Sequence, residues 1–158
     1  GRLLSRGHWV LSQYYRNKNS SNEVLDPEGW FDTGDVATID QHSYMEITDR
    51  TKDIIKSGGE WISSIELENI AMSHPDVSRA AVIGAIHPKW GERPLLIVVK
   101  VRDTNPTRET VLSFYEGKAP KWMIPDDVVF IEDIPLGSTG KVLKTKLRLD
   151  FSEHYLPN

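Results

Sequence analysis

Hydrophobic residues in the first fifty positions come in short runs between polar turns, a pattern typical of β-structure. The aromatic segment 8–15 predicts a strand, and the polar segment 16–22 predicts a loop. Asp26-Pro27-Glu28-Gly29 is a turn sequence. Segments 36–39 and 44–47 predict a hairpin around four polar residues. No helix is expected here, and because isolated hairpins are marginal in water, we expect these strands to belong to a larger sheet that extends beyond this chain.

From residue 51 onward the pattern alternates between strand and helix periods. Residues 53–56 predict a strand that ends at Gly58-Gly59, and Ser63 with Glu66 gives the sequence of a capping box at a helix start. The next expected elements are strands at 77–86 and 94–101, a helix at 107–117, a strand at 128–131 and a helix at 143–154. The order β-β-α-β-β-α-β-α predicts an α+β domain with a mixed β-sheet flanked by helices.

Composition then excludes several classes of function. The 158 residues are 39% hydrophobic and 27% charged, as in ordinary globular proteins, and fit one domain, or one small domain plus a piece of another. A net charge of −4 argues against nucleic-acid binding. The longest apolar run, 95–99, is far shorter than the roughly 20 residues of a transmembrane segment.

The composition and the motifs also exclude several kinds of catalytic and metal site. The chain has no cysteine, which removes disulfides, thiolate zinc sites and cysteine nucleophiles. Its five histidines lack zinc-ligand spacing, and no Gly-x-Ser-x-Gly nucleophile motif occurs. No metal ligands are therefore assigned. Absence of cysteine is compatible with a reducing compartment, and we expect a cytoplasmic protein.

Three segments in the first half could bind a ligand, and each has a structural alternative. Asp35, in Thr33-Gly34-Asp35, could accept hydrogen bonds from two ribose hydroxyls, but a capped turn is the favoured interpretation. Charges alternate over residues 49–53, as in a solvated linker or hinge, where Arg50 could contact a phosphate or ribose. The paired glycines within residues 56–61 allow close approach of a ligand, although a tight turn is the favoured interpretation.

The fourth segment, Pro135-Leu136-Gly137-Ser138-Thr139-Gly140-Lys141, ends in Gly-Lys but is not a phosphate-binding P-loop. Pro135 stands where that motif needs glycine, and Val142 stands where it needs serine or threonine. The segment predicts a mobile loop that presents Lys141 to an anionic substrate, or a surface lysine in solvent. A basic helix face is a further alternative, formed by Lys144, Lys146 and Arg148.

Together these segments resemble a known family. In chain order, residues 29–35, 47–63, 66–68 and 135–141 closely resemble the C-terminal signature of AMP-forming acyl-CoA synthetases. The same superfamily contains peptide-synthetase adenylation domains and luciferases. The resemblance covers essentially the whole chain, and residues 56–64 and 87–94 look most like bacterial fatty-acyl-CoA and methylmercaptopropionate-CoA ligases.

The resemblance implies a division into two parts. Residues 1–50 resemble the last β-barrel strands of a large adenylation domain, and residues 51–158 resemble the small mobile C-terminal lid domain of such enzymes. The carboxylate pocket and phosphate-gripping loop are then expected in an N-terminal adenylation domain that this chain lacks, its partner in cis. The fragment alone is expected to be inactive.

The implied reaction has two steps. A carboxylate attacks ATP to give an acyl-adenylate and pyrophosphate, and the thiol of coenzyme A then displaces AMP. ATP, Mg²⁺ and coenzyme A are therefore implied, and the expected acid is a medium- or long-chain fatty acid. An aryl or sulfur-containing acid, or a non-catalytic binding module with the lid fold, remains an alternative. No nucleic acid or transmembrane segment is expected, and a homodimer is compatible with the sequence.

The resemblance also implies roles for individual residues. Asp35 matches the aspartate that binds the ribose hydroxyls, and Arg50 matches an arginine that contacts the nucleotide. Lys52 matches the hinge, and Lys141 matches the lysine that bridges carboxylate and α-phosphate during adenylation. In the thioester-forming pose, the residues implied to line the pantetheine channel are Gly58, Gly59, Glu60 and Trp61, and Lys56 matches a position brought toward the active site.

Overall fold

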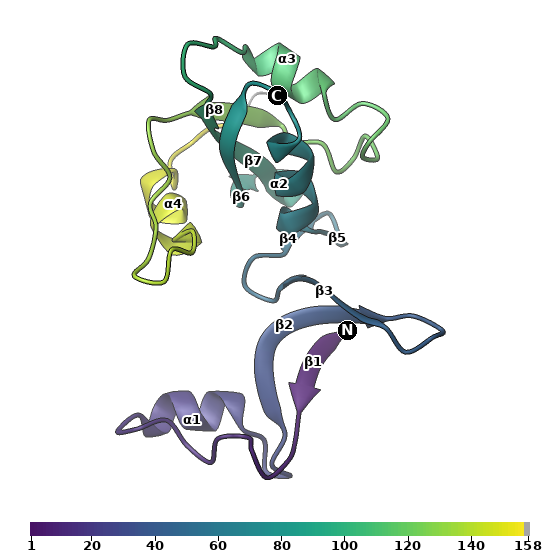
Figure 1. Cartoon of the computed structure of the whole chain (residues 1–158), viewed down its shortest axis with the longest axis vertical. Helices are drawn as coiled ribbons and strands as arrows, with labels where there is room; N and C mark the ends of the chain where they lie inside the picture. The colour runs from purple at the N-terminus through teal and green to yellow at the C-terminus, as the bar shows by residue number, and fades with distance from the viewer. Residues whose placement is uncertain (157–158) are drawn as a thin grey trace. The chain divides into compact units, whose positions relative to one another are not determined.

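The computed structural model describes residues 1–156 and divides the chain into two compact units, Gly1–Lys52 and Asp53–Asn158 (Figure 1). Unit 1 holds one antiparallel sheet in the order β1-β2-β3 and one helix. Its elements are β1 (Arg2–Ser5), α1 (Lys18–Val24), β2 (Phe31–Ile39) and β3 (Met45–Arg50).

Strands β2 and β3 confirm the predicted hairpin. Ala37 pairs with Ile47 and Ile39 with Met45, and the Asp40 carboxylate closes the turn by accepting the backbone N–H groups of His42 (2.8 Å) and Tyr44 (2.9 Å). Asp26 organises the predicted turn before β2 in the same way, because its Oδ1 accepts the N–H groups of Glu28 and Trp30. Aspartates are suited to such turns because their short side chains reach the backbone two residues on.

The predictions for segments 8–15 and 16–22 are wrong. Segment 8–15 forms turns and a single bridge, with the side chains of Trp9 and Tyr15 more than four-fifths exposed, and the strand of this region is β1. The polar stretch after it contains helix α1, which begins where the Asn17 side chain accepts the N–H of Ser20. This helix is specified by its cap and by the buried Ser21 hydroxyl. Its sequence therefore has no apolar periodicity from which a helix could be predicted.

Unit 2 follows the predicted order of elements throughout. They are β4 (Ile55–Ser57), β5 (Glu60–Ile62), α2 (Ser64–Met72), β6 (Val77–His87), β7 (Gly91–Lys100), α3 (Arg108–Ser113), β8 (Asp127–Phe130) and α4 (Lys144–Asp150). The sheet runs β5-β4-β7-β6 with antiparallel neighbours, and β8 pairs with β7 in parallel. The expected α+β fold with a mixed sheet is confirmed.

The central strand β7 contributes side chains to a hydrophobic core on each face of this sheet. Leu96 and Val98 pack with side chains of α2 and α3, whereas Leu95 and Ile97 pack with Leu147 of α4 on the opposite face. All five side chains are essentially inaccessible. Successive residues of a strand point to opposite faces, so one apolar run serves both layers. Figure 1 shows α2 and α4 on either side of the sheet.

Helices α2 and α3 begin at side-chain caps, and α3 and α4 are shorter than predicted. Ser63 caps α2 by accepting the N–H of Glu66, and Thr107 caps α3 in a reciprocal capping box with Thr110. Helix α3 ends at Ser113 rather than near residue 117, and α4 covers only 144–150 of the predicted 143–154. Helix ends are the boundaries that periodicity fixes least well.

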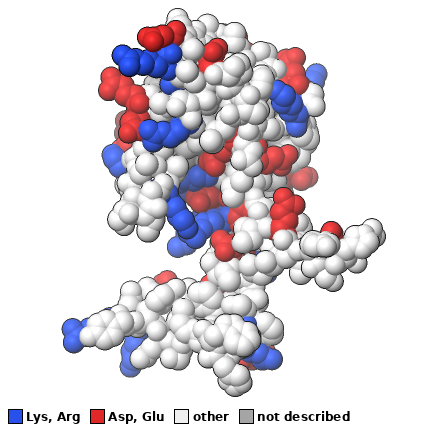
Figure 2. Space-filling model, viewed as in Figure 1, with Lys and Arg blue, Asp and Glu red and all other residues white. Residues whose placement is uncertain are grey.

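Charges of both signs are interspersed over the visible face of unit 2 (Figure 2). Many belong to local ion pairs, such as Arg79 with Asp133 at 2.9 Å. Among residues 1–156, no helix is both long and apolar enough to cross a membrane.

Candidate functional site

Asp35 and Arg50 lie opposite each other on neighbouring strands of unit 1. They are register partners across β2 and β3, and Arg50 Nε lies 3.4 Å from Asp35 Oδ1. The Asp35 side chain is 21% exposed and that of Arg50 is 61% exposed, so both groups remain accessible to a ligand. An accessible carboxylate beside a guanidinium can accept hydroxyl hydrogen bonds while its charge is partly balanced.

The favoured interpretation of Thr33-Gly34-Asp35 as a capped turn is wrong, because these residues lie within strand β2. Two side chains bond the backbone just ahead of Asp35. Asp32 Oδ1 accepts the Gly34 N–H at 3.0 Å, and Thr33 Oγ1 accepts the Asp35 N–H at 3.2 Å. The Gly34 N–H lowers the pKa of Asp32 against the opposing effect of burial, with further help from Arg2. The strand therefore presents Asp35 on a locally braced backbone.

The alternating charges of residues 49–53 predict a solvated linker, but the structure does not show a uniformly solvated one. Asp49 is 1% exposed and its Oδ1 accepts the Arg50 N–H, while the Thr51 N–H donates to Gly34 at 2.9 Å. On the other side, the Asp53 carboxylate accepts a hydrogen bond from Arg148 at 2.7 Å. The chain is thus bonded to unit 1 through Thr51 and to unit 2 from Asp53, and Lys52 is the residue between them.

The paired glycines make the two-residue turn of the β4–β5 hairpin. Gly58 and Gly59 have φ of +58° and +95° between the paired residues Ser57 and Glu60, as in the hairpin turns that glycine favours. Gly58 donates its N–H to the Trp90 carbonyl, and a Cβ at Gly58 would lie 2.6 Å from the Trp90 ring. The close approach at Gly58 is therefore to Trp90, whereas the space beside Gly59 is open.

The other predicted positions of this hairpin lie beside the turn. Lys56 pairs with Trp61, which is 59% exposed, and the Lys56 N–H donates to Glu92 Oε2 at 2.9 Å. Glu60 is exposed. Lys56, Glu60 and Trp61 are thus all available at the surface of unit 2.

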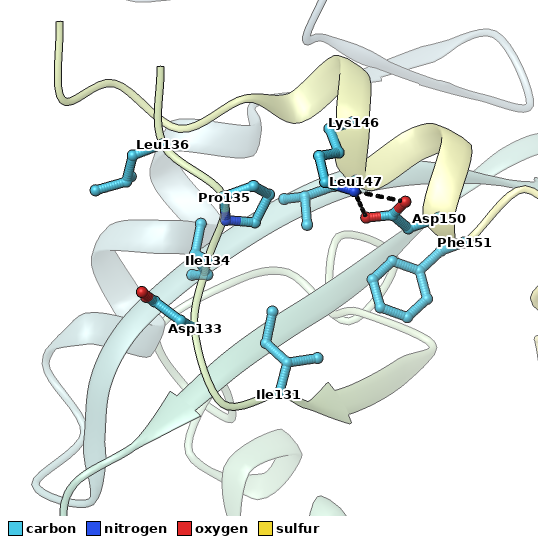
Figure 3. Close-up of a pocket in the computed structure, with 9 residues that line it drawn as sticks. All are labelled: Ile131, Asp133, Ile134, Pro135, Leu136, Lys146, Leu147, Asp150 and Phe151. Atoms are coloured by element: carbon cyan, nitrogen blue, oxygen red, sulfur yellow. Dashed lines mark hydrogen bonds and ion pairs between the residues drawn. The ribbon is translucent and has the colours of Figure 1, made fainter. Parts of the chain in front are cut away.

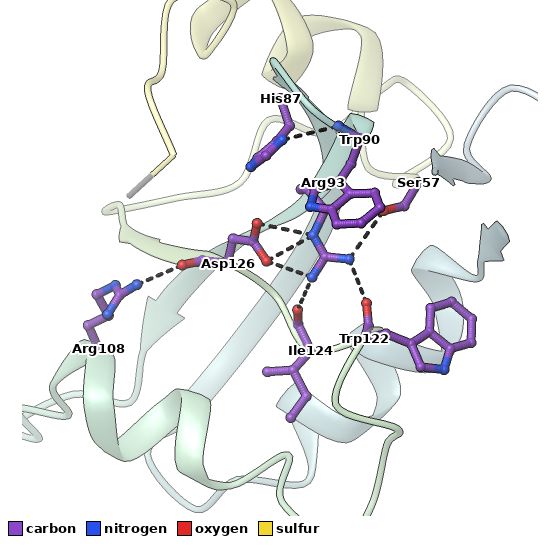
Figure 4. A network of polar contacts seen from close by, with 8 residues as sticks. All are labelled: Ser57, His87, Trp90, Arg93, Arg108, Trp122, Ile124 and Asp126. Carbon is purple, nitrogen blue, oxygen red and sulfur yellow. Dashed lines mark hydrogen bonds and ion pairs between the residues drawn. The ribbon is translucent and has the colours of Figure 1, made fainter. Parts of the chain in front are cut away.

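Sequence reasoning missed Arg93, which anchors this hairpin. Its guanidinium binds the Asp126 carboxylate through Nε and Nη2 at 2.6–3.0 Å and donates to Ser57 Oγ and to the carbonyls of Trp122 and Ile124 (Figure 4). Only 11% of the side chain is exposed. Arg93 therefore fixes the end of β4 to the loop before β8.

A pocket of about 320 Å³ opens over this anchor. Its lining residues are Ser57, Gly58, Glu60, Trp90, Arg93, Trp122 and Asp126. Two of the positions predicted from the sequence, Gly58 and Glu60, thus share one hollow with two tryptophans.

Lys141 lies on a closed loop ahead of α4. Leu136 bridges to Val142, and the Gly137 N–H donates to the Lys141 carbonyl at 2.8 Å. The Leu143 N–H donates to the Pro135 carbonyl at 2.9 Å, which joins the loop base to the helix. Lys141 itself is exposed, and among the described residues its ammonium group belongs to no ion pair. The loop therefore holds one accessible cation.

The alternative of a basic helix face on α4 is wrong. Lys144 pairs with Glu68 at 2.7 Å, Lys146 with Asp150 at 3.0 Å and Arg148 with Asp53 at 2.7 Å. Each cation has a carboxylate partner within unit 2, so α4 presents no surplus positive charge to a polyanion.

A second pocket, of about 400 Å³, lies between α4 and the segment that leads into the Lys141 loop (Figure 3). Its apolar lining includes Ile131, Leu136 and Phe151, and the Lys146–Asp150 pair lies at its edge. No predicted site residue lines this pocket.

The structure therefore gathers the predicted residues into three groups, each described within its own unit. Asp35 and Arg50 form one group in unit 1, and the β4–β5 hairpin and the Lys141 loop form two groups in unit 2. Over residues 1–156, no group of three or more histidine or acidic side chains could hold a metal ion.

Comparison with known proteins gives these groups a context. The family described as AMP-binding enzyme C-terminal domain matches residues 66–141. The chain is 58% identical over 153 residues to 3-methylmercaptopropionyl-CoA ligase of Ruegeria lacuscaerulensis, covering 97% of this chain and 28% of the relative. It is 50% identical over 153 residues to medium-chain-fatty-acid–CoA ligase of Ectopseudomonas oleovorans, with the same coverage.

A solved protein structure also has a similar fold. The crystal structure of ATP-bound MatB from Rhodopseudomonas palustris matches with a TM-score of 0.84 and 31% identity, over 92% of this chain and 29% of that one. The chain thus spans under a third of the length of these relatives. Its homologues include acyl-CoA ligases, and residues 66–141 match the C-terminal domain of AMP-binding enzymes.

Proposed function

We propose that this chain is the C-terminal part of an AMP-forming acyl-CoA ligase that activates a carboxylic acid with ATP and transfers it to coenzyme A. Residues 1–50 would complete a larger adenylation domain, and residues 51–158 would be its mobile lid, working in the cytoplasm. The observation that carries the proposal is similarity to acyl-CoA ligases over 97% of the chain. The chemistry of Asp35 and Lys141 fits this reaction.

The nucleotide contact is proposed at Asp35 and Arg50. A ribose presents two neighbouring hydroxyl donors, and an ionised carboxylate offers acceptors for both. Asp35 keeps part of its carboxylate open to solvent, and the Arg50 guanidinium lies beside it. Mg²⁺ would enter bound to the ATP phosphates.

Lys141 is proposed to act in the first step. As the acid attacks the α-phosphate, negative charge is shared between the carboxylate and the phosphoryl oxygens. An ammonium group placed between them would orient the acid and stabilise that charge. Lys141 suits this role because its loop is closed by hydrogen bonds while its side chain is exposed.

The β4–β5 hairpin is proposed to act in the second step. With the lid turned about Lys52, Gly58 and Gly59 would border the pantetheine arm, with Lys56, Glu60 and Trp61 around it. The open space beside Gly59 supports a close approach of the ligand there, since a side chain would narrow it. The bonds of Thr51 to unit 1 and of Asp53 to unit 2 support Lys52 as the pivot.

Two classes of acid are candidates. A medium- or long-chain fatty acid is the substrate class we propose, supported by 50% identity to a medium-chain-fatty-acid–CoA ligase. A 3-methylthio-substituted propionate is the second candidate, favoured by 58% identity to the Ruegeria ligase.

The test uses the complete ligase, meaning the polypeptide that joins this chain to its adenylation domain. Acid-dependent ATP–pyrophosphate exchange is measured over a panel of fatty, aryl and sulfur-containing acids, and thioester formation is followed separately from pre-made acyl-adenylate. We expect Lys141→Ala to abolish exchange and to retain most of the thioester step, with Lys121→Ala, an exposed lysine elsewhere in unit 2, as a matched control.

The outcomes of this test distinguish the proposed ligase from its alternatives. Unchanged exchange in Lys141→Ala would refute the role of Lys141. Absence of exchange by the wild type with every acid would favour a non-catalytic module with the lid fold. The isolated 158-residue chain is expected to catalyse neither half-reaction.

A further inference from the structure

Helix α4 begins with a cation, although the N-terminus of a helix favours negative charge. Its first residue is Lys144, its N-cap Leu143 supplies no side-chain cap, and its first turn holds no acidic residue. The positive end of a helix dipole disfavours a cation at this place, and an uncapped start leaves backbone donors without their usual partner. Local preferences therefore do not explain Lys144, and a tertiary contact must compensate.

That contact is with helix α2. Lys144 Nζ lies 2.7 Å from Glu68 Oε1 and 2.7 Å from Ser64 Oγ, and Glu68 Oε1 also accepts the Val82 N–H at 2.8 Å. The side chains of Lys144 and Glu68 are only 11% and 17% exposed, and Ser64 is fully buried. An ion pair this well enclosed and hydrogen-bonded holds its geometry far better than a surface pair does.

The position of Lys144 gives the contact its consequence. Only two residues separate it from Lys141, and the Leu143 N–H between them closes the loop on Pro135. We propose that Lys144, held by Glu68 and Ser64, is a positioning residue that sets the Lys141 loop for the adenylation step. This inference rests on the proposed role of Lys141.

The β4–β5 hairpin is anchored separately. Arg93 binds Ser57, and Gly58 bonds the Trp90 carbonyl, and neither contact involves α4. Loss of the Lys144 contact should therefore disturb the Lys141 loop and spare the hairpin. A purely structural role would weaken both half-reactions together.

The catalytic test compares Lys144→Ala with Lys144→Arg and Lys146→Ala in the complete ligase. Lys146 is the matched control because its pair with Asp150 on the same helix is exposed. We expect Lys144→Ala to lower kcat of pyrophosphate exchange about 10–100-fold, as a misplacement near 1 Å can do. KM for ATP should change less than about threefold, and thioester formation from pre-made adenylate should stay within about threefold, since only positioning is lost.

The conservative and compensated variants separate positioning from stability. Lys144→Arg should recover most of the exchange activity, because a guanidinium can also pair with Glu68. Lys144→Met combined with Glu68→Gln leaves no unpaired buried charge, so its unfolding midpoint should approach the wild type while exchange stays low. Unchanged exchange in Lys144→Ala would overturn the proposal, and so would equal loss of both half-reactions.

A structural readout keeps this test independent of the proposed function. In the 158-residue chain, the amides of Gly137 and Leu143 report closure of the loop. Lys144→Ala should speed their hydrogen exchange at least about tenfold relative to Lys146→Ala, with little change at Gly58. If the wild-type ligase showed no exchange of pyrophosphate with any acid, this result alone would decide whether Lys144 holds the loop, and unchanged amide exchange would refute it.

Discussion

The turn at Gly58-Gly59 allows two effects of adding a methyl group to be separated. Both glycines have positive φ, so alanine at either position is strained by about 1–3 kcal/mol. The φ of +95° at Gly59 is less favourable for an L-residue than the +58° at Gly58. Backbone strain alone thus predicts that Gly59→Ala costs at least as much stability as Gly58→Ala.

Packing reverses this order. A Cβ at Gly58 would lie 2.6 Å from Trp90 Cε3, whereas a Cβ at Gly59 meets nothing within 4 Å. Overpacking of this kind costs a further 1–3 kcal/mol or so. We therefore expect Gly58→Ala to destabilise unit 2 by about 2–6 kcal/mol, from strain and the clash together, and Gly59→Ala by about 1–3 kcal/mol, from strain alone.

The assay is native-state hydrogen exchange of the slowest amides of β7, which report the free energy of opening unit 2 by itself. Trp90→Leu supplies the control, because Trp90 is 43% exposed and its loss should be tolerated. In that background Gly58→Ala should cost no more than Gly59→Ala, a coupling of about 1–3 kcal/mol. Equal losses for the two alanines in the wild-type background would refute the packing argument.

Three further substitutions test other contacts. Arg93→Lys should destabilise unit 2 by about 2–4 kcal/mol, because lysine cannot bind Asp126 through two nitrogens and reach the remaining partners; hydrogen exchange measures this, and a loss below that of the exposed Arg79→Lys would contradict it. Tyr115→Phe should cost about 0.5–1.5 kcal/mol in the same assay, since it removes the buried bond to the Leu67 carbonyl, and no loss would argue that this bond is unimportant. Burial alone would raise the pKa of Asp127, but hydrogen bonds from Arg108, the Val128 N–H and His154 outweigh it and lower that pKa. A depressed folded-state pKa gives stability that is present above about pH 4 and is lost as the pH falls through the folded value. The unfolding midpoint of Asp127→Asn, followed from pH 6 to 2, should therefore be lower at pH 6 and vary less than that of the wild type, and parallel curves would refute the argument.

Hydrophobic periodicity predicted the fold where burial decides the structure. Every element of unit 2 appears in the expected order because its strands and helices pack into the cores on the two faces of one sheet. Helix α1 could not be predicted in this way, since an Asn17 cap and the Ser21 hydroxyl define it instead of an apolar face. Segment 8–15 shows the opposite error, because its aromatic side chains are strand formers that remain exposed.

Candidate ligand contacts were visible in sequence only where a local motif marks them. Gly58-Gly59 and Gly140-Lys141 are such motifs, and the structure places the first in a tight turn and the second on a closed loop. Arg93 could not be found because Asp126 lies 33 residues away, and Lys144 could not because Ser64 lies 80 residues away. A side chain that acts through a distant partner leaves no spacing for sequence reasoning to detect.

The two long-range anchors of unit 2, Arg93 and Lys144, each hold a different loop in place. Arg93 fixes one end of β4 beside the glycine turn, and Lys144 fixes the start of α4 beside the Lys141 loop. The partners described for Arg93, which are Asp126, Ser57 and the carbonyls of Trp122 and Ile124, differ from those described for Lys144, which are Glu68 and Ser64. If the lid presents these two loops to the same reactants in turn, each must keep its shape while the other is engaged. Independent anchors satisfy this requirement, because strain introduced at one loop by its ligand does not pass through a shared contact to the other.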